Sequence, residues 1–77
     1  MTKYFHIVQV HPVENGLPNL SKVELGREFA TEEDAEYWIK TFNWGNKSLR
    51  TTHGPDYVPE RKAVYVGCFN DETGELV

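Results

Sequence analysis

Four side chains in this sequence are of the types that bind soft metals or act as nucleophiles: His6, His11, His53 and Cys68. A zinc site needs at least three such ligands that converge, and the spacing of these four matches no zinc pattern. A nucleophilic Cys68 would need an exposed thiol in electropositive surroundings, whereas its neighbours Val66, Gly67 and Phe69 are uncharged. We therefore expect no catalytic residue, no metal and no cofactor, and interpret the chain as a non-enzymatic protein.

Aromatic rings alternate with cations from Trp44 to Lys62, a pattern that suits single-stranded nucleic acid through stacking and phosphate neutralisation. The candidate residues for this function are Trp44, Arg50, His53, Tyr57 and Arg61. In the alternative interpretation, Trp44 and Tyr57 fold back as lids over the helix end, because a small core needs large rings. The net charge of -4 argues against general affinity for nucleic acid.

The densest charge feature is the run of carboxylates from Glu28 to Glu36. Acids in a first helical turn complement the helix dipole, which by itself explains most of this run. The alternative is an acidic patch that docks on a basic partner. The candidate protein-contact residues are Glu32, Glu33 and Glu36.

A helix is predicted from about Glu32 to Asn43, with Thr31 as its N-cap. Its apolar stripe recurs at i, i+3, i+4 and i+7 and consists of Ala35, Trp38, Ile39 and Phe42. Lys40 and Asn43 fall among the residues expected to face away from the core. Gly45 is expected to end the helix in a left-handed cap.

Three segments have the composition or alternation of strands: Tyr4–Val10, Ser21–Phe29 and Lys62–Phe69. Pro12 is expected to end the first, which carries bulky apolar residues on both faces and is therefore predicted to be central. The first two strands are expected to pair as an antiparallel hairpin. A turn over residues 70–74 precedes a stub of a fourth strand over residues 75–77.

Residues 46–61 show no sustained period and are expected to form a long loop, with a short strand over Leu49–Thr52 as one alternative. The predicted fold is α+β: a small antiparallel sheet of three or four strands with one helix packed on one face, in the order β-β-α-loop-β. The other sheet face is then either polar or the place where a partner sits.

The 77 residues and 39% hydrophobic content predict one small domain over residues 1–77. One cysteine excludes an intrachain disulfide, so we expect self-association or close packing to supplement the core. Residues 1–11 do not resemble a signal peptide and no stretch is apolar enough to span a bilayer, which predicts a cytoplasmic protein without membrane contacts.

The overall plan resembles that of small phage-encoded host-inhibitor proteins and short antitoxin domains. This resemblance implies a regulatory or inhibitory accessory protein. From the spare sheet face and the acidic helix edge, either of which could form the contact, we expect a protein-interaction module that binds a protein partner and forms a homo-oligomer. Weak single-stranded nucleic-acid binding through the segment from Trp44 to Lys62 is the alternative function.

Overall fold

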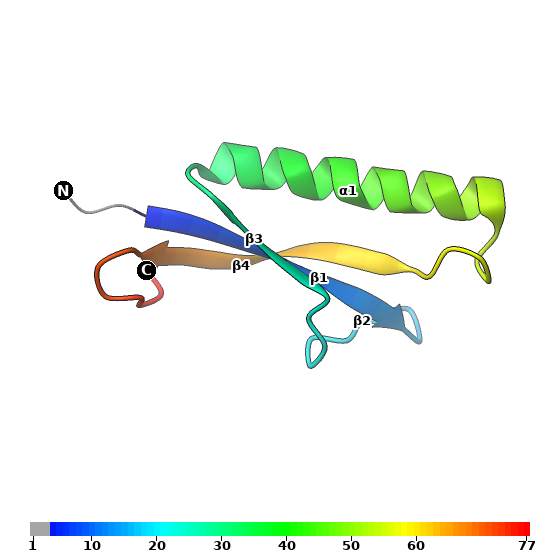
Figure 1. Ribbon diagram of the computed structural model, residues 1–77, viewed down its shortest axis with the longest axis horizontal. Coiled ribbons are helices and arrows are strands. Elements are labelled where there is room, and N and C mark those ends of the chain that lie inside the picture. The colour runs from blue at the N-terminus through cyan, green and yellow to red at the C-terminus, as the bar shows by residue number, and fades with distance from the viewer. Residues whose placement is uncertain (1–3) are drawn as a thin grey trace.

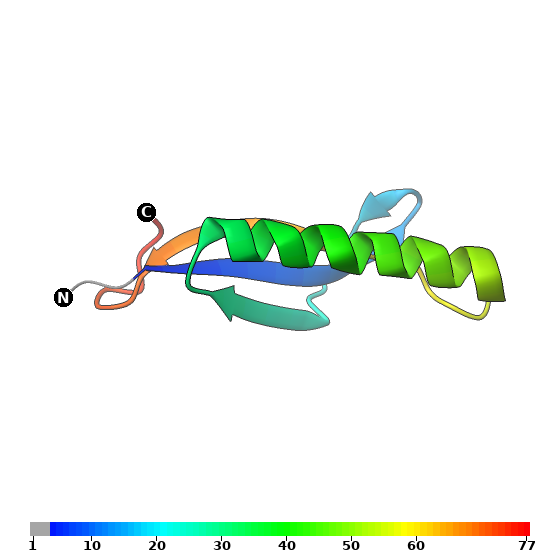
Figure 2. The ribbon, with the colours of Figure 1, turned by 90° about the horizontal axis from the view of Figure 1, so that it is seen from above.

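The computed structural model describes residues 4–77, in which one helix lies along one side of a small antiparallel sheet (Figure 1). The elements in chain order are β1 (Tyr4–Glu14), β2 (Leu17–Pro18), β3 (Leu25–Phe29), α1 (Glu32–His53) and β4 (Arg61–Asn70). Seen from above, α1 runs along β1, with β3 to one side (Figure 2). The α+β fold expected from the sequence is confirmed.

The central strand is β1, as the bulky residues on both of its faces predict. It pairs antiparallel with β3 from His6–Phe29 to Val10–Leu25, and with β4 from Tyr4–Asn70 to Pro12–Arg61. A bulge in β4 shifts the register between Ile7 and Val8 of β1. The predicted pairing of the first two long strands is therefore confirmed, and β2 adds a short pair at the far end of β1.

Pro12 does not end the first strand, which continues to Glu14. Proline lacks only the N–H, so it is tolerated where that side of the strand faces no ladder. The last pair between β1 and β3 is Val10–Leu25, so Pro12 lies beyond the part of β1 that pairs with β3. The Pro12 carbonyl accepts from the amide of Asn19 at 2.8 Å. The chain then reverses at Asn15 and Gly16, whose φ angles of 55° and 80° suit a tight hairpin turn.

The second long strand begins at Leu25 rather than at Ser21. The preceding residues turn instead, because the amide of Lys22 donates to the Asn19 carbonyl at 3.1 Å. The Lys22 carbonyl lies 2.7 Å from Nδ1 of His11, a buried ring. Only Phe29 of the expected apolar face packs on the core, while Val23 and Leu25 are exposed.

The helix starts where the sequence predicts. The Thr31 hydroxyl accepts from the amide of Asp34 at 3.1 Å, and three acids occupy the first turn. Ala35 is fully buried against Val8, Val10 and Ala63, the other members of the buried core. Trp38, Ile39 and Phe42 pack around this core and are partly buried, so the predicted apolar stripe is confirmed. Phe29 and Tyr65 pack on the same core from the strands.

The prediction that the helix ends near Asn43 is wrong, because α1 continues to His53 and is capped by Gly54. A single glycine inside a helix costs only about 1 kcal/mol, so Gly45 weakens the helix without ending it. The expected loop over residues 46–61 is thus mostly helix, and the short strand over Leu49–Thr52 is a helical turn. The connection to β4 shortens to residues 54–60.

Candidate interaction surfaces

The face of the sheet opposite α1 carries no helix within the described residues (Figure 1), and an apolar cluster at its centre is bordered by polar side chains. Because side chains alternate along a strand, Phe5 and Ile7 point away from the helix-facing Val8 and Val10. Phe69 is paired with Phe5 and therefore lies on the same side. A hollow of about 490 Å³ on this face is lined by Phe5, Ile7, Gln9, Glu28, Val66, Phe69, Asn70, Asp71 and Gly74. We call it the open sheet face.

The C-terminal segment borders one end of the open sheet face. The predicted turn is present, and the amide of Val77 donates to the Cys68 carbonyl at 2.7 Å. Leu76 forms an isolated bridge with Phe69, which is what remains of the expected fourth strand. Its side chain fills the space over Gly67, where a Cβ atom would collide with it. The open sheet face is therefore bounded by the chain's own C-terminal residues.

At Arg61 and Ala63 the outer edge of β4 is closed by side chains of α1 rather than by another strand. The Asn43 carboxamide accepts from the Ala63 amide at 2.8 Å and donates to the Ala63 carbonyl at 3.4 Å. Asn46 likewise accepts from the Arg61 amide at 3.2 Å and donates to the Pro59 carbonyl at 3.3 Å. The expectation that Asn43 faces away from the sheet is therefore wrong, because its amide satisfies strand groups that would otherwise lack partners.

The three acidic candidates lie on the first two turns of α1, and all are exposed. Glu32 and Glu36 lie near the half-buried Tyr65. Burial raises the pKa of Tyr65, and the negative charges of Glu32, Cys68 and Glu36 raise it further. These carboxylates therefore form a negative edge beside the Tyr65 end of the core.

The five nucleic-acid candidates do not converge on one surface. Arg50 and Arg61 line the same groove, but the Arg50 guanidinium donates to the Val58 carbonyl at 2.9 Å and Arg61 is paired with Glu24. The rings of His53 and Tyr57 lie 5.6 Å apart at the end of α1. Trp44 is not among the residues that line the groove.

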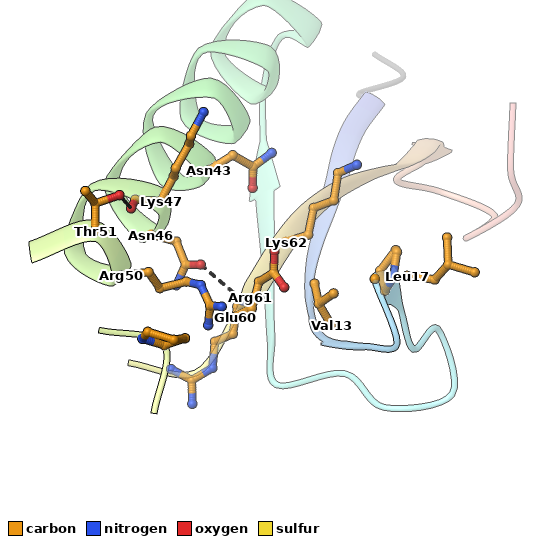
Figure 3. Close-up of a pocket in the computed structure, with 13 residues that line it drawn as sticks. Val13, Leu17, Asn43, Asn46, Lys47, Arg50, Thr51, Glu60, Arg61 and Lys62 are labelled. Atoms are coloured by element: carbon orange, nitrogen blue, oxygen red, sulfur yellow. Dashed lines mark hydrogen bonds between the residues drawn. The ribbon is translucent and has the colours of Figure 1, made fainter. Parts of the chain in front are cut away.

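The groove containing Arg50 and Arg61 has a volume of about 630 Å³ and lies between the second half of α1 and the β1–β2 hairpin (Figure 3). Lys47 and Lys62 also line it, whereas Glu60 is the one acid among its lining residues. Val13, Leu17, Pro18 and Pro55 supply apolar walls. We call this hollow the cationic groove.

Trp44 and Tyr57 do not act as lids. Their exposed fractions are 72% and 76%, because the core is filled by Trp38, Phe42 and Phe29. Trp38 stacks on Phe42 with ring centroids 5.2 Å apart. A second exposed ring, Tyr37 at 73%, lies on α1 seven residues before Trp44 and was not a sequence candidate. The i, i+7 spacing of the two rings is the signal that identifies this pair.

The four soft ligands are dispersed. Cys68 lies opposite His6 in the β1–β4 ladder, but Nδ1 of His6 is 2.9 Å from the Tyr65 hydroxyl. His11 is buried beside Lys22, and His53 ends the helix. Over residues 4–77, no three histidine, cysteine or acidic side chains come together as a metal site.

Comparison of the chain with protein-family models, with curated proteins and with solved structures finds no match. The one described helix is not apolar enough to cross a membrane.

Proposed function

We propose that this chain is a small, non-enzymatic interaction module of the cytoplasm that binds a protein partner through the open sheet face. The observation that carries the proposal is the apolar cluster on that face, formed by Phe5, Ile7, Val66 and Phe69. Two-layer folds bury one face of the sheet, and an apolar second face marks a site of association.

The shape and rim of the open sheet face support a partner with an apolar surface bordered by cations. The described chain measures 48 × 23 × 14 Å, so the sheet is long and thin and presents an extended contact surface. Glu28 and Asp71 are the charged residues among those lining its hollow. Interfaces of this type combine an apolar centre with a polar rim.

The acidic edge formed by Glu32, Glu33 and Glu36 has a secondary role in this proposal. Exposed charges steer a partner of opposite sign toward its site and raise the association rate more than the final affinity. A regulatory or inhibitory accessory role is consistent with a chain that supplies surfaces rather than a reaction centre.

Two matched valine variants test the proposal. Val66→Lys places a charge on the open sheet face at a residue that is already 40% exposed, whereas Val23→Lys makes the same change before β3 begins. Each chain is immobilised and exposed to an extract of the cells that encode it. We expect proteins held by the wild-type and Val23→Lys chains to be lost from the Val66→Lys chain. Equal retention by all three chains would contradict the proposal.

The cationic groove favours a second candidate function, weak binding of single-stranded nucleic acid. Lys47 and Lys62 line it, and Trp44 lies exposed on the same half of α1. Titration with an oligonucleotide at low salt is expected to quench the tryptophan fluorescence of the wild-type chain but not that of Trp44→Phe. An unchanged wild-type signal at low salt, where electrostatic binding is strongest, rules out stacking of the bases on Trp44.

A further inference from the structure

Two large aromatic side chains lie on the side of α1 that faces away from the sheet. Tyr37 and Trp44 are both largely exposed, and seven residues make almost two helical turns, so the rings share one stripe. Figures 1 and 2 show the outer side of α1 uncovered along its length. Tryptophan and tyrosine are the residues most enriched at the energetic centres of protein interfaces. We use the name outer helix face for the stripe of side chains on this side of α1, from Glu33 to Thr51.

Two hydroxyls of the outer helix face have hydrogen-bond partners within the helix. The hydroxyl of Thr41 donates to the Tyr37 carbonyl at 2.9 Å, and that of Thr51 donates to the Lys47 carbonyl at 2.9 Å. A hydroxyl with an internal partner costs little when water is removed from it. Burial of Thr41 and Thr51 therefore costs little, whereas Lys40, between the two rings, must keep its ammonium group in water at the edge of a contact.

Charge reverses along this helix. Glu32, Glu33, Asp34 and Glu36 occupy its start, whereas the ionisable side chains from Lys40 to His53 include no carboxylate. Lys47 carries positive charge on the second half, whereas the Arg50 guanidinium is turned toward the Val58 carbonyl. A surface that is negative at one end and positive at the other complements a copy of itself turned end to end.

From this arrangement we infer that the outer helix face binds the same face of a second copy, with the two helices antiparallel about a two-fold axis between residues 40 and 41. Tyr37 then packs on the partner's Trp44, and Trp44 on the partner's Tyr37. Glu33 faces the positive region around the partner's Lys47. A parallel arrangement places the acidic ends together, and is disfavoured by repulsion. The open sheet face stays free for another protein.

The first test is sedimentation of the full chain over a range of micromolar concentrations in low-salt buffer. The wild-type chain is expected to shift from the 8.9 kDa monomer toward twice that mass. Tyr37→Ala with Trp44→Ala is expected to weaken the dimer by about tenfold or more. The control is Tyr57→Ala, which removes an equally exposed ring outside the helix and is expected to leave the dimer unchanged.

The second test reverses charge. Glu33→Lys and Lys47→Glu are each expected to weaken the dimer, and the chain carrying both changes is expected to recover it, because each new cation meets a new carboxylate on the partner. The two positions lie fourteen residues apart on one helix, about 21 Å, so they cannot pair within a chain. Recovery in the double variant distinguishes the antiparallel from the parallel arrangement, in which like charges would still face each other.

A wild-type chain that remains monomeric at the highest concentration overturns the inference. A dimer that persists in the Tyr37→Ala, Trp44→Ala chain but is lost in the Val66→Lys chain also overturns the inference. Such a result would place self-association on the open sheet face. A monomer that still retains a protein through Val66 refutes the dimer while leaving the proposed function intact. Circular dichroism of each variant checks that the helix content is unchanged.

Discussion

The side-chain amide of Asn43 forms hydrogen bonds with both backbone polar groups of Ala63, at 2.8 Å and 3.4 Å. An amide side chain thereby occupies the position that the backbone of a neighbouring strand would otherwise take. The second half of α1 is tied to the edge of β4 through this pair and through Asn46. The edge of β4 is thereby closed to strand addition at Arg61 and Ala63.

Replacement of Asn43 with alanine is expected to destabilise the fold by about 1–3 kcal/mol, because it leaves two part-buried backbone groups of Ala63 without partners. Urea denaturation followed by circular dichroism measures the effect. The matched change Asn46→Ala removes bonds at an exposed site and is expected to cost less. Equal stability of Asn43→Ala and wild type would contradict the closed-edge interpretation.

Two glycines of α1 are expected to respond to alanine in opposite directions. Gly45→Ala should stabilise the chain by about 0.5–1 kcal/mol, since Gly45 is inside the helix and a Cβ atom there meets nothing within 4 Å. Gly54→Ala should destabilise it by about 1 kcal/mol or more, because its φ of 92° is unfavourable for a residue with a side chain. Thermal unfolding of both variants measures these effects. A lower unfolding temperature for Gly45→Ala than for the wild type would refute the helix boundaries.

The Tyr65 hydroxyl is expected to ionise at a higher pH than an ordinary tyrosine, because its pKa is raised. Burial is the main cause of its raised pKa, and Glu32 and Glu36 contribute by charge. Glu32→Gln is therefore expected to lower the pKa of Tyr65 without restoring the ordinary value. Tyrosinate absorbance during alkaline titration, with Tyr65→Phe as the reference, measures this pKa.

The raised pKa of Tyr65 contributes to the dependence of the free energy of unfolding on alkaline pH. Because the folded state raises the pKa of Tyr65, its contribution to stability is fully present below the unfolded value of 10.0 and is lost as pH rises through the folded value. Tyr65→Phe is expected to reduce the fall in stability above that pH. An identical alkaline profile for this variant would contradict the assigned cause.

Gly67→Ala is expected to displace the C-terminal segment. A Cβ atom at Gly67 collides with the Leu76 side chain, which is exposed and can move away. We expect faster carboxypeptidase trimming of the last residues and faster exchange of the Val77 amide, which donates to Cys68. Gly26→Ala serves as the control in another strand, because a Cβ atom there meets nothing within 4 Å. Equal trimming of both variants would show that Leu76 does not anchor the segment.

The elements that local physics specifies strongly were predictable from the sequence. The Thr31 cap, the first-turn acids and the stripe through Trp38 and Phe42 are set by neighbouring residues, and all are present. The central position of β1 followed from apolar residues on both of its faces. The apolar open sheet face was one of two outcomes left open, since a chain this short has little left to cover it.

What depends on distant contacts was not predictable. The second half of α1 lacks a continuous apolar stripe, and bonds from Asn43 and Asn46 to a strand some fifteen to twenty residues away link it to β4. The sequence left open whether Trp44 is exposed or forms a lid; it is exposed because four core rings, Phe29, Trp38, Phe42 and Tyr65, already surround the small buried centre. The pairing of Tyr37 with Trp44 on one stripe was not predictable from a helix that ends near Asn43, one residue before Trp44.

The most direct test of the central claim is to map chemical shifts of the labelled chain as a captured partner is added. If the partner binds the open sheet face, the largest chemical-shift changes are expected at Phe5, Ile7, Val66 and Phe69, with smaller changes at Glu28 on its rim. Changes confined to residues outside this face, with Ile7 and Val66 unmoved at saturation, would contradict the claim that the uncovered side of the sheet is where a partner binds.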